Sequence, residues 1–148
     1  MKIRTSIAAV GAAAVLAGTG AVLLPAVASA HSTTHTLKFT AVQLKSSNFS
    51  KTAGGSAEKD VNSAGKIIGY DVSNFQFHPT TNTASGGVAL STSGGFLYGA
   101  LKFTSTSSVV HGTVTGGTGA FKGATGTITG TQNKAGTQTA VTITYTTP

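Results

Sequence analysis

Apolar and polar residues alternate with a period of two along most of the chain beyond residue 36. The alternation is clearest at residues 110–115 and 140–147, where apolar or small side chains occupy one face and threonine dominates the other. This period is typical of strands that bury one face, and the same region has no stretch with the period of about 3.6 residues that a helix requires. The pattern therefore predicts an all-β domain.

Turn-forming clusters of Gly, Ser, Asn and Pro divide this region into short runs. About eight runs at hairpin spacing indicate a sandwich or an up-and-down barrel. The expected strands are 37–44, 57–61, 66–77, 86–92, 96–103, 108–115, 123–130 and 140–147. Residues 31–36 are expected to fray, and residues 46–56 to form a loop. The apolar positions change parity after Ala41, which favours a bulge or a strand that is covered on both faces.

The stretch 111–130 has the most definite backbone pattern in the chain. Two extended runs flank the cluster at 116–119, Gly-Gly-Thr-Gly, in which glycine accepts positive φ and permits a tight turn. Phe121 follows as a lone large apolar residue. A phosphate-binding glycine loop needs a helix after its glycines, and none is expected here, so a hairpin is favoured.

Residues 114–126 resemble the signature turn of the barrel shared by allene oxide cyclases and plant dirigent proteins. That turn has Gly-Gly-Thr/Ala-Gly, then an aromatic residue, then a small pair such as Gly-Ala. The corresponding residues here are 116–119, Phe121 and Gly123-Ala124.

Two other stretches extend the resemblance over residues 37–145. Residues 60–69 resemble the family's acidic residue, turn and Gly-Lys entry into a long strand, and residues 96–103 resemble its apolar strand with a central glycine. The resemblance implies an all-β fold, namely an eight-stranded antiparallel up-and-down (calycin-like) β-barrel.

The family resemblance also implies a function. Allene oxide cyclases guide a spontaneous ring closure, and dirigent proteins steer the coupling or closure of phenolic intermediates with carboxylates assisting. A water-poor cavity performs such chemistry by positioning, desolvation and one or two placed charges. A small apolar or phenolic ligand is therefore implied, with isomerase-like or stereo-directing activity and no cofactor.

Asp60 and Asp71 are the candidate catalytic residues. Asp60 matches the acid before the Gly-Lys turn, and Asp71 shares a strand face with Phe75 and Phe77. The competing interpretation of each carboxylate is a solvated turn or a hydrogen-bonded strand position. The candidate substrate-binding residues are aromatic, with the tyrosines supplying hydroxyls: Tyr70, Phe75, Phe77, Phe96, Tyr98, Phe103 and Tyr145. The catalytic Glu and Asn of the cyclases have no secure counterpart here, and the family's usual cysteine is absent.

Residues 1–30 are predicted to be a secretory signal peptide, and residues 31–148 a single barrel domain. A basic start precedes an apolar run at 7–24, and the Ala-Ser-Ala at 28–30 fits the small-residue cleavage rule. The run is short and broken by a Gly-Thr-Gly segment, which argues against a membrane anchor. We therefore expect a secreted, extracellular protein that is not attached to a membrane and that, with no cysteine, folds without disulfides.

The chain is basic, with a formal net charge of +7 and only three acidic residues. Its lysines are scattered, no arginine remains after the predicted cleavage, and aromatic residues are not interleaved with them. This distribution favours a soluble basic surface over nucleic-acid binding. A non-specific attraction to anionic wall material is also compatible with it.

No metal site is expected from the histidines. His31 and His35 lie about 13 Å apart in an extended segment, too far to share a metal ion. The alternative is a copper site on the amino group and imidazole of His31, which requires His78 or His111 to approach.

Two hypotheses therefore remain for the function. In the first, the barrel cavity binds a small molecule beside Asp60 or Asp71. In the second, side chains fill the barrel, and the protein acts without catalysis through its threonine-rich outer surface, against wall material or other subunits of a homo-oligomer. The first hypothesis requires a void next to one of the two acids, and the second predicts none.

Overall fold

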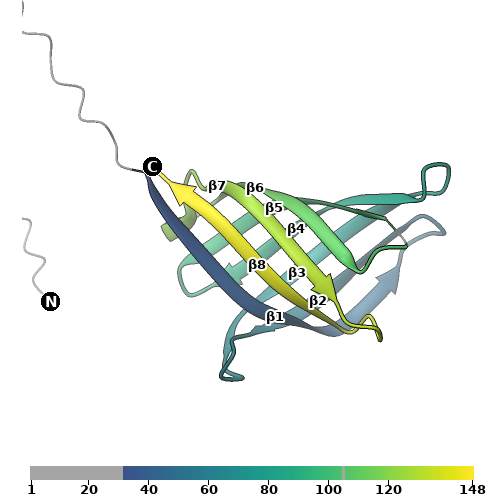
Figure 1. Ribbon diagram of the computed structural model, residues 1–148, viewed down its shortest axis with the longest axis horizontal. Coiled ribbons are helices and arrows are strands. Elements are labelled where there is room, and N and C mark those ends of the chain that lie inside the picture. Colours follow the sequence, from purple (N-terminus) through teal and green to yellow (C-terminus); the bar gives the residue numbers. More distant parts are fainter. Residues whose placement is uncertain (1–31, 105) are drawn as a thin grey trace, which may run out of the picture.

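The computed structural model describes residues 32–104 and 106–148, which form a closed barrel of eight antiparallel strands (Figure 1). In chain order the strands are β1 (Thr33–Asn48), β2 (Ala53–Val61), β3 (Ile67–His78), β4 (Thr83–Thr92), β5 (Gly95–Thr104), β6 (Val109–Gly117), β7 (Thr125–Gln132) and β8 (Gln138–Thr147). Each strand pairs with the next, and β1 pairs with β8. The predicted all-β, up-and-down antiparallel barrel is confirmed. The predicted signal peptide, residues 1–30, and His31 lie outside the described residues.

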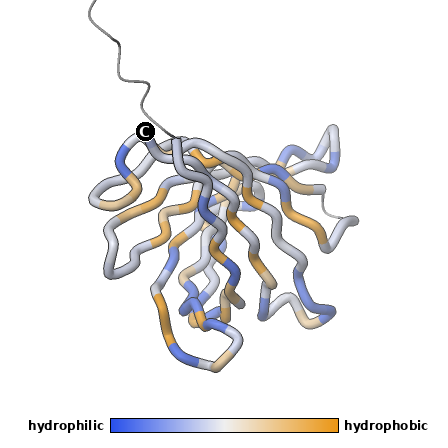
Figure 2. The backbone as a smooth tube through the Cα atoms, turned by 60° about the vertical axis from the view of Figure 1, so that its left-hand side comes forward, coloured by the Kyte–Doolittle hydropathy of each residue, from blue (hydrophilic) through white to orange (hydrophobic). Residues whose placement is uncertain are grey.

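The predicted alternation sets the inner face of the strands. Figure 2 shows the apolar residues concentrated along the strands and the hydrophilic ones in the turns. In β8, Val141, Ile143 and Tyr145 face the interior as predicted, and Ile143 and Tyr145 are buried there. In β7, Ile128 is buried between Gly126 and Gly130, while the threonines are exposed. These strands bury one face against the core and expose the other to solvent.

Two of the predicted boundaries are wrong at the start of the chain. Residues 33–36 were expected to fray but pair with the end of β8, because backbone hydrogen bonds hold this polar segment whatever its side chains are. Residues 46–56 were expected to form a loop, yet β1 continues to Asn48 and β2 starts at Ala53. Of the two alternatives for the change of parity in the first strand, a bulge or cover on both faces, the structure has a bulge between Gln43 and Lys45.

The glycine motif closes one end of the barrel. Gly116 and Gly119 have φ values of +144° and +59°, so the chain leaves β6 in a conformation that side chains disfavour. A single 3₁₀ turn, η1 (Gly119–Phe121), follows, and Phe121 is buried in the core. Its ring meets that of Tyr145 edge to face at a centroid distance of 5.6 Å. This end of the barrel is therefore sealed by aromatic packing.

The turns β1–β2, β3–β4, β5–β6 and β7–β8 gather at the opposite end of the barrel. This arrangement follows from the up-and-down order, since alternate turns in such a sheet lie at the same end. The η1 turn, between β6 and β7, does not lie at this end. Among the described residues, no helix has the length and apolar character needed to cross a membrane.

Candidate binding cavity

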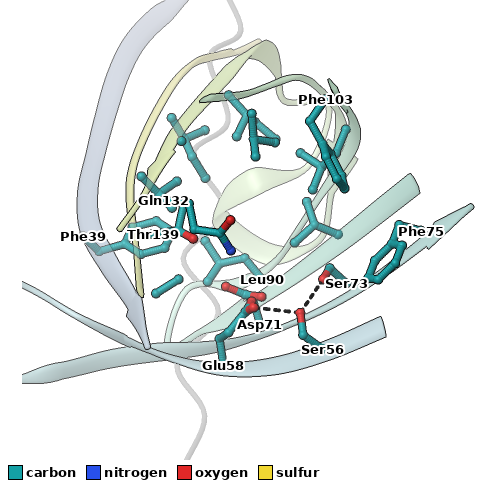
Figure 3. Close-up of a pocket in the computed structure, with 18 of the residues that line it drawn as sticks. Phe39, Ser56, Glu58, Asp71, Ser73, Phe75, Leu90, Phe103, Gln132 and Thr139 are labelled. Carbon is teal, nitrogen blue, oxygen red and sulfur yellow. Dashed lines mark hydrogen bonds between the residues drawn. The ribbon is translucent and has the colours of Figure 1, made fainter. Parts of the chain in front are cut away.

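A cavity of about 190 Å³ lies inside the barrel, and all eight strands contribute to its wall. Most of the wall is apolar, as the side chains of Phe39, Leu90 and Phe103 in Figure 3 illustrate. An engineered protein cavity of about 150 Å³ accommodates benzene, so this cavity has room for a compact molecule of one or two rings. The second hypothesis required side chains to fill the barrel, and the cavity shows that they do not fill it.

A polar sector on β2 and β3 interrupts the apolar wall. Glu58 lies opposite Asp71 in the β2–β3 ladder, and Ser56 lies opposite Ser73. The Ser56 hydroxyl donates to Glu58 Oε1 at 2.7 Å, and the Ser56 and Ser73 hydroxyl oxygens are 2.8 Å apart (Figure 3). Because Ser56 has one hydroxyl hydrogen and gives it to Glu58, Ser73 is the donor to Ser56. The result is a hydrogen-bonded chain that ends on the carboxylate of Glu58.

The three acidic residues of the whole chain meet in this sector. Asp60 is 0% exposed and Asp71 is 6% exposed, although acidic side chains are seldom buried unless they are paired with a cation. Asp71 lies within hydrogen-bonding reach of both Glu58 and Asp60. No lysine is among the described residues that line the cavity. We refer to Glu58, Asp60 and Asp71 as the acid cluster.

Burial changes the protonation of the acid cluster. Burial, with hydrogen bonding to Glu58 and the negative charges of Glu58 and Asp60, raises the pKa of Asp71 to about 10. Burial also raises the pKa of Asp60 to about 6, although its hydrogen bond with Asp71 opposes the rise, and the charge of Glu58 adds to it. If Asp60 and Asp71 were both ionised, the two oxygens of Asp60 and Oδ1 of Asp71 would have no hydrogen-bond donor. A proton kept on Asp71 provides a donor within the acid cluster. At neutral pH, Asp71 is therefore a carboxylic acid.

The structure brings Asp71, Phe75 and Phe103 together on the cavity wall. The rings of Phe75 and Phe103 meet edge to face at a centroid distance of 6.2 Å. Asp60 is fully buried and does not itself line the cavity. Phe77 lines a shallower groove that it shares with Phe75 and Phe103.

Tyr145 lies in the core at the closed end instead of on the cavity wall. Its ring packs between Phe121 and His35, and the His35 ring stacks on it at a centroid distance of 5.2 Å. Burial raises the pKa of the Tyr145 hydroxyl. Tyr145 therefore packs the closed end of the barrel and would not contact a ligand that is bound beside Asp71.

Tyr70, Phe96 and Tyr98, which were expected to bind the substrate, lie outside the cavity. Their side chains are 53%, 46% and 39% exposed, and none of the three lines the cavity. Strand parity is the reason, because Tyr70 directly precedes the inward Asp71, and Phe96 and Tyr98 flank the inward Leu97. Phe96 and Tyr98 stack on each other outside the barrel, with their ring centroids 6.3 Å apart.

Sequence reasoning missed most of the polar residues that line the cavity. Ser56, Glu58 and Ser73 belong to the polar sector, and Gln132 and Thr139 lie on the β7–β8 wall (Figure 3). A signal existed for Glu58, which shares strand parity with Asp60. It was overlooked because a strand with polar inward residues looks like a loop.

The histidines do not form a metal site in the part of the chain that the structure describes. No group of three or more His, Cys, Asp or Glu side chains there could hold a metal ion. His78 and His111 line an outer groove together with Lys102. The copper alternative depends on His31, which lies outside the described residues.

Comparisons with known proteins support the fold alone. No protein-family model matches the chain, and no curated protein matches its sequence. A pyocyanin demethylase shares the fold with a TM-score of 0.62 and 16% identity, covering 75% of this chain and 99% of its own. The pterocarpan synthase dirigent protein GePTS1 shares it with a TM-score of 0.50 and 16% identity, covering 78% of this chain and 83% of its own. The chain thus has the dirigent and allene oxide cyclase type of barrel fold that its glycine motif implied.

Proposed function

We propose that the barrel binds one small, largely apolar molecule, phenolic molecules included, and orients it beside the acid cluster for ring closure or coupling. The observation that carries this proposal is the carboxylic acid of Asp71, which is buried and lines a mostly apolar cavity. The shared fold supports it, since one similar structure is a pyocyanin demethylase and the other a pterocarpan synthase dirigent protein.

The acid cluster would contribute by hydrogen bonding and charge. A neutral carboxylic acid in a water-poor site is a strong donor toward an oxygen that gains negative charge during a reaction. Glu58 is held in place by the hydroxyls of Ser56 and Ser73, so the carboxylate beside Asp71 is fixed before a ligand arrives. Ring closure within one molecule only rearranges its bonds, and coupling would act on reactive species that are formed elsewhere. In both cases the main task of the cavity is positioning.

The location of the protein outside the cytoplasm is proposed from the sequence alone. The signal peptide predicted at residues 1–30 would place the barrel outside the cytoplasm. Assembly into a homo-oligomer remains a prediction, for which the exposed aromatic residues on the outside of β3 and β5 are a candidate surface.

Indole titration tests whether the cavity binds a small apolar molecule. Indole is neutral, has two fused rings, and fluoresces according to the polarity around it, and the chain has no tryptophan to obscure the signal. We expect a saturable blue shift with the wild-type protein. Ser73→Phe adds a ring to the cavity wall and should abolish the shift. Val72→Phe adds the same ring at the neighbouring outward position, which is 57% exposed, and should retain it.

Two results would overturn the proposed function. One is the absence of a saturable shift with wild-type protein whose circular dichroism shows a folded β-sheet. The other is an equal loss of indole binding in folded Ser73→Phe and Val72→Phe variants, which would place the indole outside the cavity.

A further inference from the structure

We propose that this cavity selects small aromatic or aliphatic molecules that carry a positive charge, such as a protonated amine or a quaternary ammonium group. The inference rests on the proposed function, because it concerns the ligand of the same cavity. It starts from the placement of every acidic side chain of the chain at one side of the barrel interior, with no basic group on the cavity wall among the described residues.

The groups that face the acid cluster are neutral. Gln43 on β1 lies opposite Glu58, and Leu90 on β4 lies opposite Asp71 in their ladders. Across the cavity, β7 and β8 contribute Gln132 and Thr139. The acids therefore face only one another and uncharged side chains, and nothing built into the wall neutralises them.

The lysine nearest in sequence to the acid cluster does not approach it from inside. Lys59 lies between Glu58 and Asp60 on β2, so its side chain leaves on the outer face, where it lies opposite Tyr70. A buried charge without a partner is costly, and a cation from outside the chain would offset that cost.

The acid cluster also lacks hydrogen-bond donors. Asp71 is nine-tenths buried and lines the cavity, yet with both groups as carboxylates its Oδ1 and both oxygens of Asp60 find no donor among the described residues. One proton on Asp71 can serve either Glu58 or Asp60, not both. An N–H group of a ligand that donates to Glu58 would leave the Asp71 proton for Asp60. A ligand amine therefore supplies both the charge and the donor that the cluster lacks.

The rest of the cavity suits the apolar part of such a ligand. Phe39, Phe75 and Phe103 line it, and aromatic faces attract cations as well as burying rings. The volume of about 190 Å³ limits the ligand to a compact body of one or two rings. An anion of the same size would meet the carboxylates with no compensating base and should be excluded.

Displacement of indole by three molecules of matched size tests the inference. Benzylammonium, benzyl alcohol and benzoate differ mainly in charge. We expect benzylammonium to bind about tenfold or more tightly than benzyl alcohol at neutral pH, because a hydrogen bond to a charged group is stronger than one between neutral groups. Benzoate should not displace indole. Glu58→Gln should weaken the preference for the cation, because it removes one of the two charged carboxylates while Asp60 remains. Lys59→Gln, on the outer face of the same strand, should leave the preference at its wild-type size.

A pH series on the wild-type protein gives a second readout that needs no variant. The phenyltrimethylammonium ion keeps its charge at every pH, so any change in its affinity comes from the protein. Its affinity should rise between about pH 5 and 7, as Asp60, with a pKa of about 6, loses its proton. The affinity of benzyl alcohol should stay constant over this range.

The outcomes separate this inference from the proposed function. Equal affinities for benzylammonium and benzyl alcohol, or a cation preference that is as large in folded Glu58→Gln as in the wild-type protein, overturn the inference and leave the proposed function standing. If indole does not bind the folded protein, the proposed function fails, and direct calorimetry with benzylammonium then decides the inference. Tighter binding of benzoate than of benzylammonium overturns it outright.

Discussion

Asp71 is a case in which a single residue keeps its proton so that it can be buried. Its carboxyl interacts with two other acids, Glu58 and Asp60. No lysine that could pair with it is among the described residues of the cavity wall. Ionising it there would add a third negative charge to a place that water scarcely reaches. The neutral form avoids this cost and provides a donor to its neighbours.

The raised pKa values of Asp60 and Asp71 predict a protein that is more stable in mild acid than at neutral pH. Unfolded carboxyls titrate at the ordinary value of 3.8, so from there up to their folded pKa values the folded state holds more protons than the unfolded state. The free energy of unfolding should therefore be highest near pH 4 and fall as the pH rises, by at most about 1.4 kcal/mol per pH unit for each retained proton.

Urea denaturation across about pH 4.5 to 8 measures this slope. Asp71→Asn keeps the size of the side chain but cannot titrate, so it should flatten the slope. A wild-type stability that increases with pH over this range would contradict the assignment of the proton to the acid cluster.

At the scale of elements, strands with apolar inward residues could be predicted and strands with polar ones could not. β8 follows from its alternation alone, and its inward residues were identified correctly. β2 carries Ser56, Glu58 and Asp60 inward, so the apolar half of the pattern is missing and only residues 57–61 were recognised as a strand. Glu58 was not identified for the same reason. A polar residue can be assigned to the inner face of β2 only when the strands that form the rest of the cavity wall are known.

The aromatic residues of β3 and β5 show a second limit. Phe75 and Phe103 face inward and Tyr70 and Tyr98 face outward, although all four had been assigned to one cavity on their chemistry. Parity within β3 already separated Tyr70 from Asp71. For β5 the continuous apolar run gave no indication of which parity faces inward, because that depends on pairing with β4 and β6.

The η1 turn provides a prediction about an element. Phe121 is 5% exposed and packs on Tyr145, so Phe121→Ala should destabilise the protein by about 3–5 kcal/mol through the lost contacts and the cavity left behind. Phe49, in the β1–β2 turn, is 71% exposed, and Phe49→Ala should change the stability by less than about 0.5 kcal/mol. Thermal and urea unfolding of both variants measure the difference. Similar losses in the two variants would mean that η1 does not seal the barrel.

At the scale of the whole molecule, opposite charges are sorted to the two sides of one sheet. The acids lie at the interior, while exposed lysines lie on the outer face of a strand, as Lys38 does in β1, or in the turns, as Lys66 and Lys122 do. The field that a large partner or a resin meets is therefore more basic than the net charge suggests.

Cation-exchange chromatography at about pH 8 can detect this sorting. Lys38→Gln should elute at clearly lower salt than the wild-type protein, because it removes a charge that the resin meets directly. Asp60→Asn removes one negative charge from a fully buried position and should move the elution by less in the opposite direction. Shifts of equal size in the two variants would refute the separation of interior and exterior charge.

The pairing of β1 with β8 also determines when folding can finish. Thr33 lies opposite Thr147, so the two ends of the domain must meet before the ladder closes. Until β8 is available, β1 and β7 each lack the neighbour that they have in the finished barrel. Sheets held by such distant contacts fold in about milliseconds to seconds, far slower than helical bundles. A growing chain of this protein therefore cannot close its barrel until its last strand has been made.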